Sequence, residues 1–452
     1  MQEAIMKIAF IGAGSVGFTR KLTADILSVP EFQDIEICLE DISAFNLDLV
    51  YNVIVQDIKA NKLTKVKLTK TTDQKKAIEG AKYVICVARV GGLEAFALDV
   101  EIPLKYGVDQ CVGDTLCAGG IMYGQRTIPV IMGICKDMKA YAEKNAVLLN
   151  YSNPNAMNTW AANSYAGVQT LGLCHGVQGG HKQIADVLGL KQSEVDIICA
   201  GLNHQTWYIQ VKHNGEDMLD KLLAGFRKHP VYSKQEKVRI DILEKFGYYS
   251  TESNGHLSEY LPWYRKRRDE IDKWIDYSAW IHGETGGYLR VCREHRAAFE
   301  KEAKEYQTMK PLKYTAKNRS NEHGSHILEG LETGRIYRGH FNVINKGAIT
   351  NLPPDCCVEV PGYADGNGIS IPIVGDLPAQ CAAICNASVA VQRLSVEAAL
   401  EGDPVKLKQA MLLDPLTGAV CNPPEVWKLT DEMLKAQSQW LPQYQKYIKK
   451  IK

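Results

Sequence analysis

A glycine-rich turn near the start of the chain restricts the possible folds more than any other feature of the sequence. The apolar run at residues 7–11 leads directly into Gly12-Ala13-Gly14-Ser15-Val16-Gly17, and a stretch with helical spacing of apolar residues follows at 15–29. Between a strand and a helix, the first glycine allows a tight turn, the second lets the backbone approach a pyrophosphate, and the third permits close helix–strand packing. The helix N-terminus then offers N–H groups and the positive end of its dipole to phosphates. The pattern predicts a dinucleotide-binding domain.

An acidic residue after the second strand indicates which dinucleotide is bound. The apolar run at 35–39 is followed by Asp41, 24 residues beyond Gly17. A carboxylate at this place accepts hydrogen bonds from ribose hydroxyls and disfavours a 2′-phosphate, so NAD+ is predicted rather than its phosphorylated form. We expect Gly12, Gly14, Ser15, Val16, Gly17 and Asp41 to contact the cofactor. A structural glycine turn in a non-binding α/β domain is the alternative.

Strands and helices alternate through the first half of the chain. Strands are predicted at 7–11, 35–39, 65–69, 82–88, 146–150 and 168–174, and helices at 15–29, 43–61, 73–79, 120–143 and 155–164. This alternation is typical of a doubly wound parallel sheet, so the fold class is α/β with a Rossmann-like N-terminal domain similar to lactate and malate dehydrogenases.

The second half is less regular, and its pattern predicts an α+β domain that is interlocked with the N-terminal domain. Asn214-Gly215 indicates a hairpin, residues 258–310 are charged, aromatic and helical in character, and a strand is expected at 356–360. Further helices are predicted near 384–401, 403–413 and 424–437. We divide the chain into an NAD-binding domain, 1–200, and a substrate- and metal-binding domain, 201–452.

Charge and cysteine content limit the partners and the compartment. The 452 residues include 53 Lys+Arg and 52 Asp+Glu, a net charge of +1, which offers no basic field to nucleic acid or a membrane surface. No apolar run approaches the ~20 residues of a membrane helix. The start of the chain does not resemble a signal peptide, and most of the 13 cysteines lie in apolar runs, as Cys38, Cys86 and Cys199 do. We therefore expect a cytoplasmic protein with reduced, mostly buried thiols.

Two potential metal ligands follow apolar runs. Cys174-His175-Gly176 comes at the end of the strand predicted at 168–174, and His204 follows the run at 197–200. Ligands in open α/β sheets bind at the carboxyl ends of strands, which favours a site containing Cys174 and His204, although a buried thiol and a core histidine are the alternative. On composition alone a Cys/His site suggests Zn2+. Cys381 and Cys385 have ligand-like spacing, but their apolar surroundings predict core packing.

A series of short motifs follows in a fixed order along the chain: Phe10-Ile11-Gly12-Ala13-Gly14-Ser15, Val90-Gly91-Gly92, Gly113-Asp114-Thr115, Gly119-Gly120-Ile121-Met122, Arg126-Thr127-Ile128-Pro129, Asn153-Pro154, Cys174-His175-Gly176 and Asn203-His204. Together these motifs resemble glycoside hydrolase family 4, the NAD- and Mn2+-dependent glycosidases. Residues 153–160, the stretch from Thr251-Glu252-Ser253 to His256, and residues 351–360 are more specifically similar to the α-galactosidase (melibiase) branch.

The resemblance implies a redox-neutral hydrolysis of an unphosphorylated α-glycoside and favours an α-galactoside as the substrate. NAD+ oxidises C3 of the sugar, a metal stabilises the charge formed when C2 is deprotonated, and the C1–oxygen bond breaks by elimination. Water then adds and the hydride is returned. The resemblance replaces the compositional Zn2+ prediction with Mn2+, other divalent metals being possible.

The resemblance also assigns residues to roles. Cys174 and His204 match metal ligands, Gly91 and Gly92 cofactor contacts, and Asn153, Asp114 and Arg290 substrate contacts. Asn153 could instead form a turn before Pro154, and Arg290 could be an exposed helix arginine. His175 stands where relatives carry the acid that protonates the leaving group, with a supporting contact as its alternative. His256 or Tyr260 is the expected base, and a structural role for His256 stays open. The partners implied are a small-molecule glycoside and further copies of the chain, as a dimer or tetramer.

Two departures from the family leave the substrate open. Cys117-Ala118 stands where relatives usually have Gly-Pro, and Tyr123 stands where they have arginine. An α-glucoside or α-uronide therefore remains an alternative substrate, and Cys117 is expected to be an exposed, reactive thiol. An NAD-dependent hydroxy-acid dehydrogenase and a non-catalytic NAD- or sugar-binding protein are the alternatives of other classes.

Overall fold

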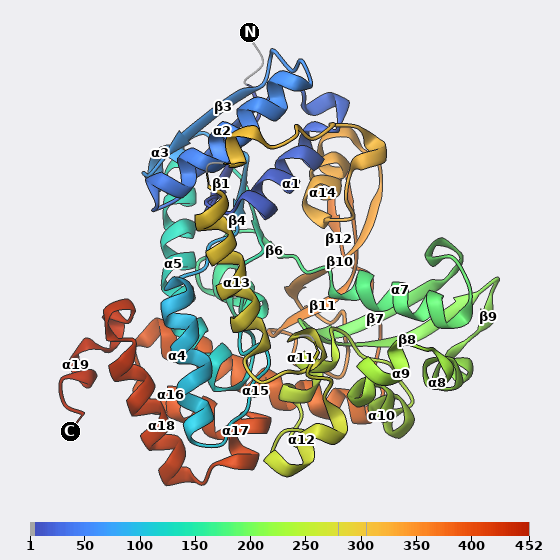
Figure 1. Ribbon diagram of the computed structural model, residues 1–452. Helices are drawn as coiled ribbons and strands as arrows, with labels where there is room; N and C mark the ends of the chain where they lie inside the picture. Colours follow the sequence, from blue (N-terminus) through green and yellow to red (C-terminus); the bar gives the residue numbers. More distant parts are fainter. Residues whose placement is uncertain (1–4, 279, 304, 452) are drawn as a thin grey trace.

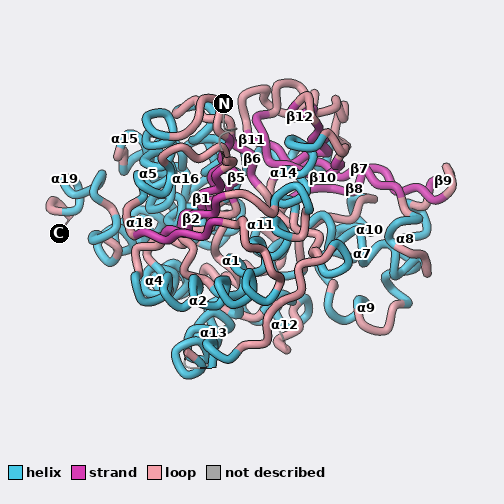
Figure 2. Tube along the Cα trace, turned by 90° about the horizontal axis from the view of Figure 1, so that it is seen from above, coloured by secondary structure: helices cyan, strands magenta, loops and turns pink. Residues whose placement is uncertain are grey.

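A single mixed sheet runs through the molecule in the computed structural model, which describes residues 5–278, 280–303 and 305–451. The described strands number twelve, in the order β3-β2-β1-β4-β5-β6-β10-β11-β7-β8-β9, with β12 paired to β11. Figure 2 shows them as a band across the molecule, ending at β9, with helices on both sides.

The first six strands form the predicted parallel, doubly wound sheet. They are β1 (Lys7–Ile11), β2 (Glu36–Glu40), β3 (Lys67–Thr71), β4 (Tyr83–Cys86), β5 (Val147–Asn150) and β6 (Thr170–Gly172). Their order, 3-2-1-4-5-6, and the parallel pairing of all neighbours confirm the Rossmann-like arrangement. Because strand order reverses between β1 and β4, the crevice at their carboxyl ends is where such sheets bind ligands.

Alternating residues of β1 explain why helices cover both faces of this sheet. Ile8 and Phe10 pack in the same core as α1 (Val16–Leu27) and α2 (Ala44–Ala60), whereas Ala9 and Ile11 pack with α3 (Gln74–Ile78) and α5 (Cys117–Tyr141). A strand with both faces covered must be apolar throughout, which is the continuous pattern seen in the sequence. Further helices of this half are α4 (Gly92–Lys105), α6 (Asn155–Trp160) and α7 (Gly176–Leu188).

The helix α4 is absent from the prediction. It begins at Gly91 and Gly92, whose φ angles are +84° and +58°, and it contains Pro103 near its end. Glycine pairs and proline normally indicate loops, so the local sequence did not predict this helix, which is stabilised by packing against the interior. Figure 1 shows α13 (Gly287–Glu302), which comes from the second half, running alongside α4.

The second half extends the sheet with antiparallel strands. They are β7 (Asp196–Leu202), β8 (Gln205–His213), β9 (Glu216–Asp217), β10 (Tyr337–Ile344), β11 (Cys357–Asp365) and β12 (Gly368–Ser370). Strands β10 and β11 lie between β6 and β7, so the halves are interlocked, and the division at residue 200 falls within β7. Asn214 and Gly215, with φ of +51° and +84°, form the predicted hairpin between β8 and β9.

Helices surround the antiparallel part of the sheet and end the chain. They are α8 (Leu219–Lys228), α9 (Tyr232–Gln235), α10 (Lys237–Phe246), α11 (Asn254–Tyr260), α12 (Arg268–Trp274), α14 (His323–Thr333), α15 (Ala379–Glu401), α16 (Pro404–Leu413), α17 (Pro415–Val420), α18 (Pro423–Ala436) and α19 (Gln445–Ile448). Cys381 and Cys385 of α15 are fully buried in the apolar core, as predicted. Within the described ranges, no helix is long and apolar enough to cross a bilayer.

Candidate active site

A cavity of about 920 Å³ lies at the carboxyl ends of the parallel strands. The loops after β1, β4, β5 and β6 contribute Gly14, Arg89, Asn153 and Cys174 to its wall. The second half contributes His204, Glu252 and His256, and α13 contributes lining residues such as Tyr288 and Cys292. Both halves of the chain therefore build one site.

The glycine-rich turn forms one end of this cavity. Gly14, Ser15, Val16 and Gly17 line it, and Ser15 precedes α1 without a side-chain hydrogen bond to the first turn. The N–H groups of that turn are therefore available to a phosphate. At Gly12 (φ +84°) a Cβ atom would come within 2.5 Å of the Ala88 Cα, so a side chain here would push the turn away from β4. These features fit a dinucleotide.

The other predicted cofactor residues, Asp41, Gly91 and Gly92, do not themselves line the cavity. The Gly14 N–H donates to Asp41 Oδ2 over 2.7 Å, which fixes the Asp41 carboxylate at the end of β2 beside the turn. Gly91 and Gly92 lie between two lining residues, Arg89 and Leu93.

Cys174, His204 and Glu252 come together in the wall of the cavity. Cys174 Sγ lies 3.7 Å and His204 Nε2 lies 3.0 Å from Glu252 Oε2, and one ligand atom of each residue lies within 4.8 Å of the others. His204 also belongs to an overlapping group with Asp114 and His256. Sulfur, imidazole nitrogen and carboxylate oxygen in this arrangement could hold a divalent cation.

Hydrogen bonding orients His204 toward that position. The Thr115 hydroxyl donates to Asp114 Oδ1 over 2.8 Å, so its oxygen can only accept from His204 Nδ1, which lies 2.9 Å away. A neutral His204 then carries its lone pair on Nε2, facing the Glu252 carboxylate. Two lone-pair-bearing atoms at 3.0 Å repel each other unless a cation or a proton lies between them. The donor set therefore fits a metal ion.

The charge states of the neighbouring groups agree with this assignment. Burial acts to raise the pKa of Glu252, but positive charge on the nearby histidines, above all a protonated His204, outweighs burial and holds the value at about 2, so the carboxylate is ionised whether a proton or a cation lies beside it. Burial raises the pKa of the Cys174 thiol well above its usual range, so a cation is needed to form the thiolate. Burial, with His204, lowers the pKa of His256 to about 4, which leaves this imidazole neutral at pH 7.

Three more predicted residues border the cluster. Asn153 Nδ2 donates to Asp114 Oδ2 over 2.8 Å, and Asn153 lines the cavity. His256 lies in the first turn of α11, and its Nδ1 lies 2.8 Å from Ser253 Oγ. His175, next to Cys174, has a side chain that is 65% exposed and lines the cavity, with Nδ1 3.6 Å from Glu322.

The structure corrects three expectations. Tyr260 is fully buried, does not line the cavity and has a hydroxyl without a partner, so it cannot reach a substrate as a base. Arg290 also lies outside the cavity wall, in exposed ion pairs with Glu284 and Glu294. Cys117 is fully buried, its thiol donates to the Glu259 carbonyl over 2.7 Å, and burial raises its pKa, so it is neither exposed nor reactive.

The sequence did not assign a role to Glu252 or Arg89. Glu252 lies in the Thr251-Glu252-Ser253 stretch that resembles the α-galactosidase branch. The resemblance therefore identified the segment but gave the Glu252 carboxylate no chemical role. Arg89 follows the apolar strand β4, where a charge next to the glycine pair could have indicated a ligand contact.

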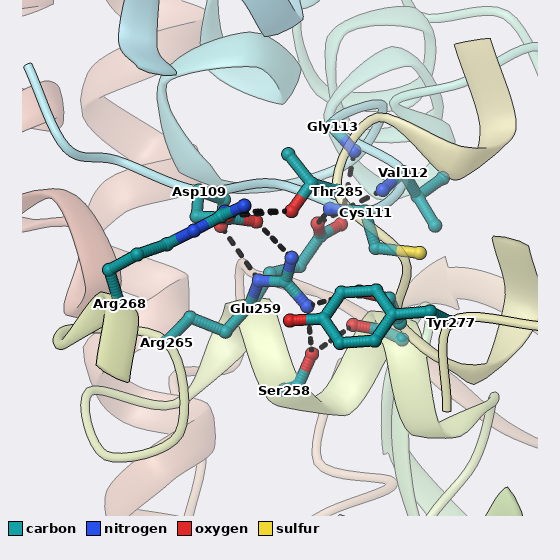
Figure 3. A network of polar contacts seen from close by, with 12 residues as sticks. Asp109, Cys111, Val112, Gly113, Ser258, Glu259, Arg265, Arg268, Tyr277 and Thr285 are labelled. Atoms are coloured by element: carbon teal, nitrogen blue, oxygen red, sulfur yellow. Dashed lines mark hydrogen bonds and ion pairs between the residues drawn. The ribbon is translucent and has the colours of Figure 1, made fainter. Parts of the chain in front are cut away.

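A buried polar network holds the loop that carries Asp114 and Thr115. The Glu259 carboxylate of α11 accepts hydrogen bonds from the backbone N–H groups of Cys111, Val112 and Gly113 over 2.7–3.1 Å. Figure 3 shows this carboxylate beside the Asp109 carboxylate, which contacts the guanidinium groups of Arg265 and Arg268. The network ties the loop to the helix that carries His256.

Replacing Glu259 with glutamine should loosen this connection. The amide nitrogen cannot accept a hydrogen bond, so one or more buried N–H groups lose their acceptor, at a cost of about 1–3 kcal/mol each. We expect a lower free energy of unfolding and a reduced kcat, measured by denaturant unfolding and steady-state kinetics. The exposed Glu294→Gln exchange is the matched control, and equal stability of the two variants would contradict the role of the network.

Comparisons with known proteins agree with this site. The profile described as family 4 glycosyl hydrolase matches residues 7–190, and that of the family 4 glycosyl hydrolase C-terminal domain matches residues 199–417. An alpha-galactosidase of Rhizobium meliloti (strain 1021) is 59% identical over 444 residues, covering 98% of this chain and 90% of the relative. An alpha-galactosidase of Bacillus subtilis (strain 168) is 34% identical over 439 residues, covering 97% and 99%. A 6-phospho-alpha-glucosidase from gut microorganisms, solved with NAD and glucose 6-phosphate, superposes with a TM-score of 0.81 at 28% identity, covering 97% of this chain and 99% of that one.

Proposed function

We propose that this chain, which belongs to glycoside hydrolase family 4, is an NAD- and Mn2+-dependent α-galactosidase that acts on unphosphorylated α-galactosides. The observation that carries the proposal is the combination, in one cavity, of an uncapped glycine-rich helix N-terminus with the Cys174–His204–Glu252 cluster. The two similar alpha-galactosidases support the choice of sugar.

The residues of the cavity would hold two groups that do different chemistry. Gly14, Ser15, Val16 and Gly17 would bind the dinucleotide phosphates, and Cys174, His204 and Glu252 would bind the cation. When bound, NAD+ supplies a two-electron oxidant that is regenerated in each turnover, and the cation supplies a Lewis acid that makes the hydrogen on the carbon next to a carbonyl more acidic.

His256 is the proposed base. It is neutral at pH 7, and because Nδ1 contacts Ser253 Oγ, Nε2 is the atom left to accept a proton from C2 of the sugar. The hydrogen bond that Ser253 Oγ accepts from the His256 N–H over 3.2 Å fixes the ring at the start of α11.

His175 is the proposed acid. Its exposed ring lies beside Cys174, at the open part of the cavity where a leaving group of variable size can be accommodated. Its Nδ1 lies 3.6 Å from Glu322 Oε1, and a protonated ring in this position can give a proton to the departing oxygen. Asn153 and Asp114 are proposed to contact the sugar hydroxyls.

We also propose a role for each half of the chain, a cellular location and an oligomeric state. Residues 1–200 would carry the dinucleotide and Cys174, and residues 201–452 would complete the metal and substrate site. The described cysteines are all free thiols, which supports a reducing cytoplasm. Exposed apolar side chains, including Ile336 and Ile373 at 72% and 77% exposure, support a homo-oligomer, which light scattering would test.

A panel of p-nitrophenyl glycosides tests the function. With NAD+, Mn2+ and a thiol present, we expect the α-galactoside to be cleaved fastest and no cleavage without NAD+, while NADH does not accumulate. Preference for an α-glucoside or α-uronide would change the sugar assignment. Accumulation of one NADH per hydroxy acid consumed would identify a dehydrogenase instead, and binding without turnover would identify a non-catalytic protein.

A further inference from the structure

Arg89 has a position unlike that of other arginines in the described interior. It follows β4 at the carboxyl end of the sheet and lines the cavity beside Asp114 and Tyr288. The buried arginines elsewhere are each paired with a carboxylate: Arg20 with Asp57, Arg126 with Asp99, Arg239 with Glu236 and Arg265 with Asp109. Among the described residues, no carboxylate lies within ion-pair distance of Arg89.

Aromatic rings from three helices hold the Arg89 guanidinium in place. Its central carbon lies 4.8 Å from the ring centre of Phe96 in α4, 5.7 Å from that of Tyr123 in α5 and 5.2 Å from that of Tyr288 in α13. Its Nη2 donates to the Tyr288 hydroxyl over 3.0 Å. The rings stabilise a cation by cation–π contact but accept no hydrogen bonds in the guanidinium plane. The remaining N–H groups therefore stay available to a molecule in the cavity.

A guanidinium that is partly removed from water without a counter-ion is costly, unless a ligand supplies the negative charge. The flat, forked arrangement of its N–H groups matches a carboxylate, which can accept two parallel hydrogen bonds. We propose that Arg89 is a specificity-determining residue that binds a carboxylate on the sugar, so that the site accepts a galacturonate ring as well as a galactose ring. The inference rests on the proposed function in that the cavity is taken to bind a galactosyl ring.

Equilibrium binding separates this inference from hydrolytic activity. Calorimetric titration of the NAD+- and Mn2+-loaded enzyme at pH 7 would use three free sugars: galactose, galacturonate and galactose 6-phosphate. We expect galacturonate to bind on the order of tenfold more tightly than galactose, because charge-assisted hydrogen bonds replace neutral ones. In Arg89→Met this preference should vanish, with galacturonate binding weakened by about tenfold to hundredfold.

Two matched variants show whether Arg89 is instead structural. Arg293→Met removes the same charge from an exposed position on α13, and it should leave the sugar preference unchanged. Arg126→Met removes a paired guanidinium that lies over the same Tyr123 ring, so it should leave Asp99 buried without a counter-ion and lower the melting temperature. Arg89→Met leaves no such carboxylate behind, and its melting temperature should stay at or above that of the parent enzyme.

Several results would overturn the inference. They are equal binding of galactose and galacturonate, a galacturonate preference that survives in Arg89→Met, tighter binding of galactose 6-phosphate than of galacturonate, and loss of NAD+ affinity in Arg89→Met. The last result would assign Arg89 to the dinucleotide. Failure of the α-galactosidase assay would leave these binding ratios measurable, so the two proposals can fail separately.

Discussion

Exchange of Cys174 for serine is expected to reduce kcat/KM on the order of 10³-fold, equivalent to about 4 kcal/mol of transition-state stabilisation. A serine hydroxyl is a much poorer ligand than a thiolate, so the cation would be lost or displaced. The dinucleotide end of the cavity does not include Cys174, and NAD+ affinity should therefore be retained. Steady-state kinetics, with bound Mn2+ measured after equilibrium dialysis, checks both parts.

Cys292→Ser is the matched control for this exchange. Cys292 is a thiol in the wall of the same cavity, but it lies on α13 and belongs to neither candidate metal group. Its exchange should preserve Mn2+ content and most of the activity. Full activity with normal Mn2+ content in Cys174→Ser would remove the cysteine from the metal site.

Exchange of Glu252 for glutamine is expected to lower kcat/KM by at least about 10²-fold and to weaken Mn2+ binding. The change keeps the shape of the side chain but removes the negative charge that lies 3.0 Å from His204 Nε2 and 3.7 Å from Cys174 Sγ. Excess Mn2+ should restore part of the activity, because the two other ligands remain. Titration of activity against Mn2+ concentration measures this shift.

Glu244→Gln supplies the corresponding control, since Glu244 forms an exposed ion pair with Arg227 away from the cavity. It should leave the Mn2+ dependence of activity unchanged. If Glu252→Gln had the same Mn2+ dependence as the parent enzyme, Glu252 would not be a ligand.

The sequence was sufficient to predict the parallel part of the fold and to single out two residues of the cluster, Cys174 and His204, that follow strands. The turn from Gly12 to Gly17 indicates the place where the strand order of the sheet reverses, and Cys174 and His204 each follow an apolar run. Glu252 follows no strand of the sheet and reaches the cluster only through tertiary packing. Its role could therefore not be predicted from local pattern.

Two of the errors concern whether a helical side chain reaches the cavity. His256 and Tyr260 are four residues apart and lie on the same side of α11, with ring centres 6.0 Å apart, but only His256 lines the cavity and Tyr260 is fully buried behind it. On α13 the residues lining the cavity follow helical spacing, as Tyr288, Cys292 and His295 do, and Arg290 falls on the opposite, exposed face. Which face of an amphipathic helix covers a site is decided by packing partners far away in the chain.

The fate of the hydrogen at C2 of the sugar tests the elimination mechanism most directly. An α-galactoside deuterated at C2 would be hydrolysed with NAD+ and Mn2+ in ordinary water, and the galactose product analysed by mass spectrometry. Proton transfer to His256 before the C1–oxygen bond breaks predicts that the product has lost deuterium to solvent. Complete retention of deuterium during efficient hydrolysis would contradict the account.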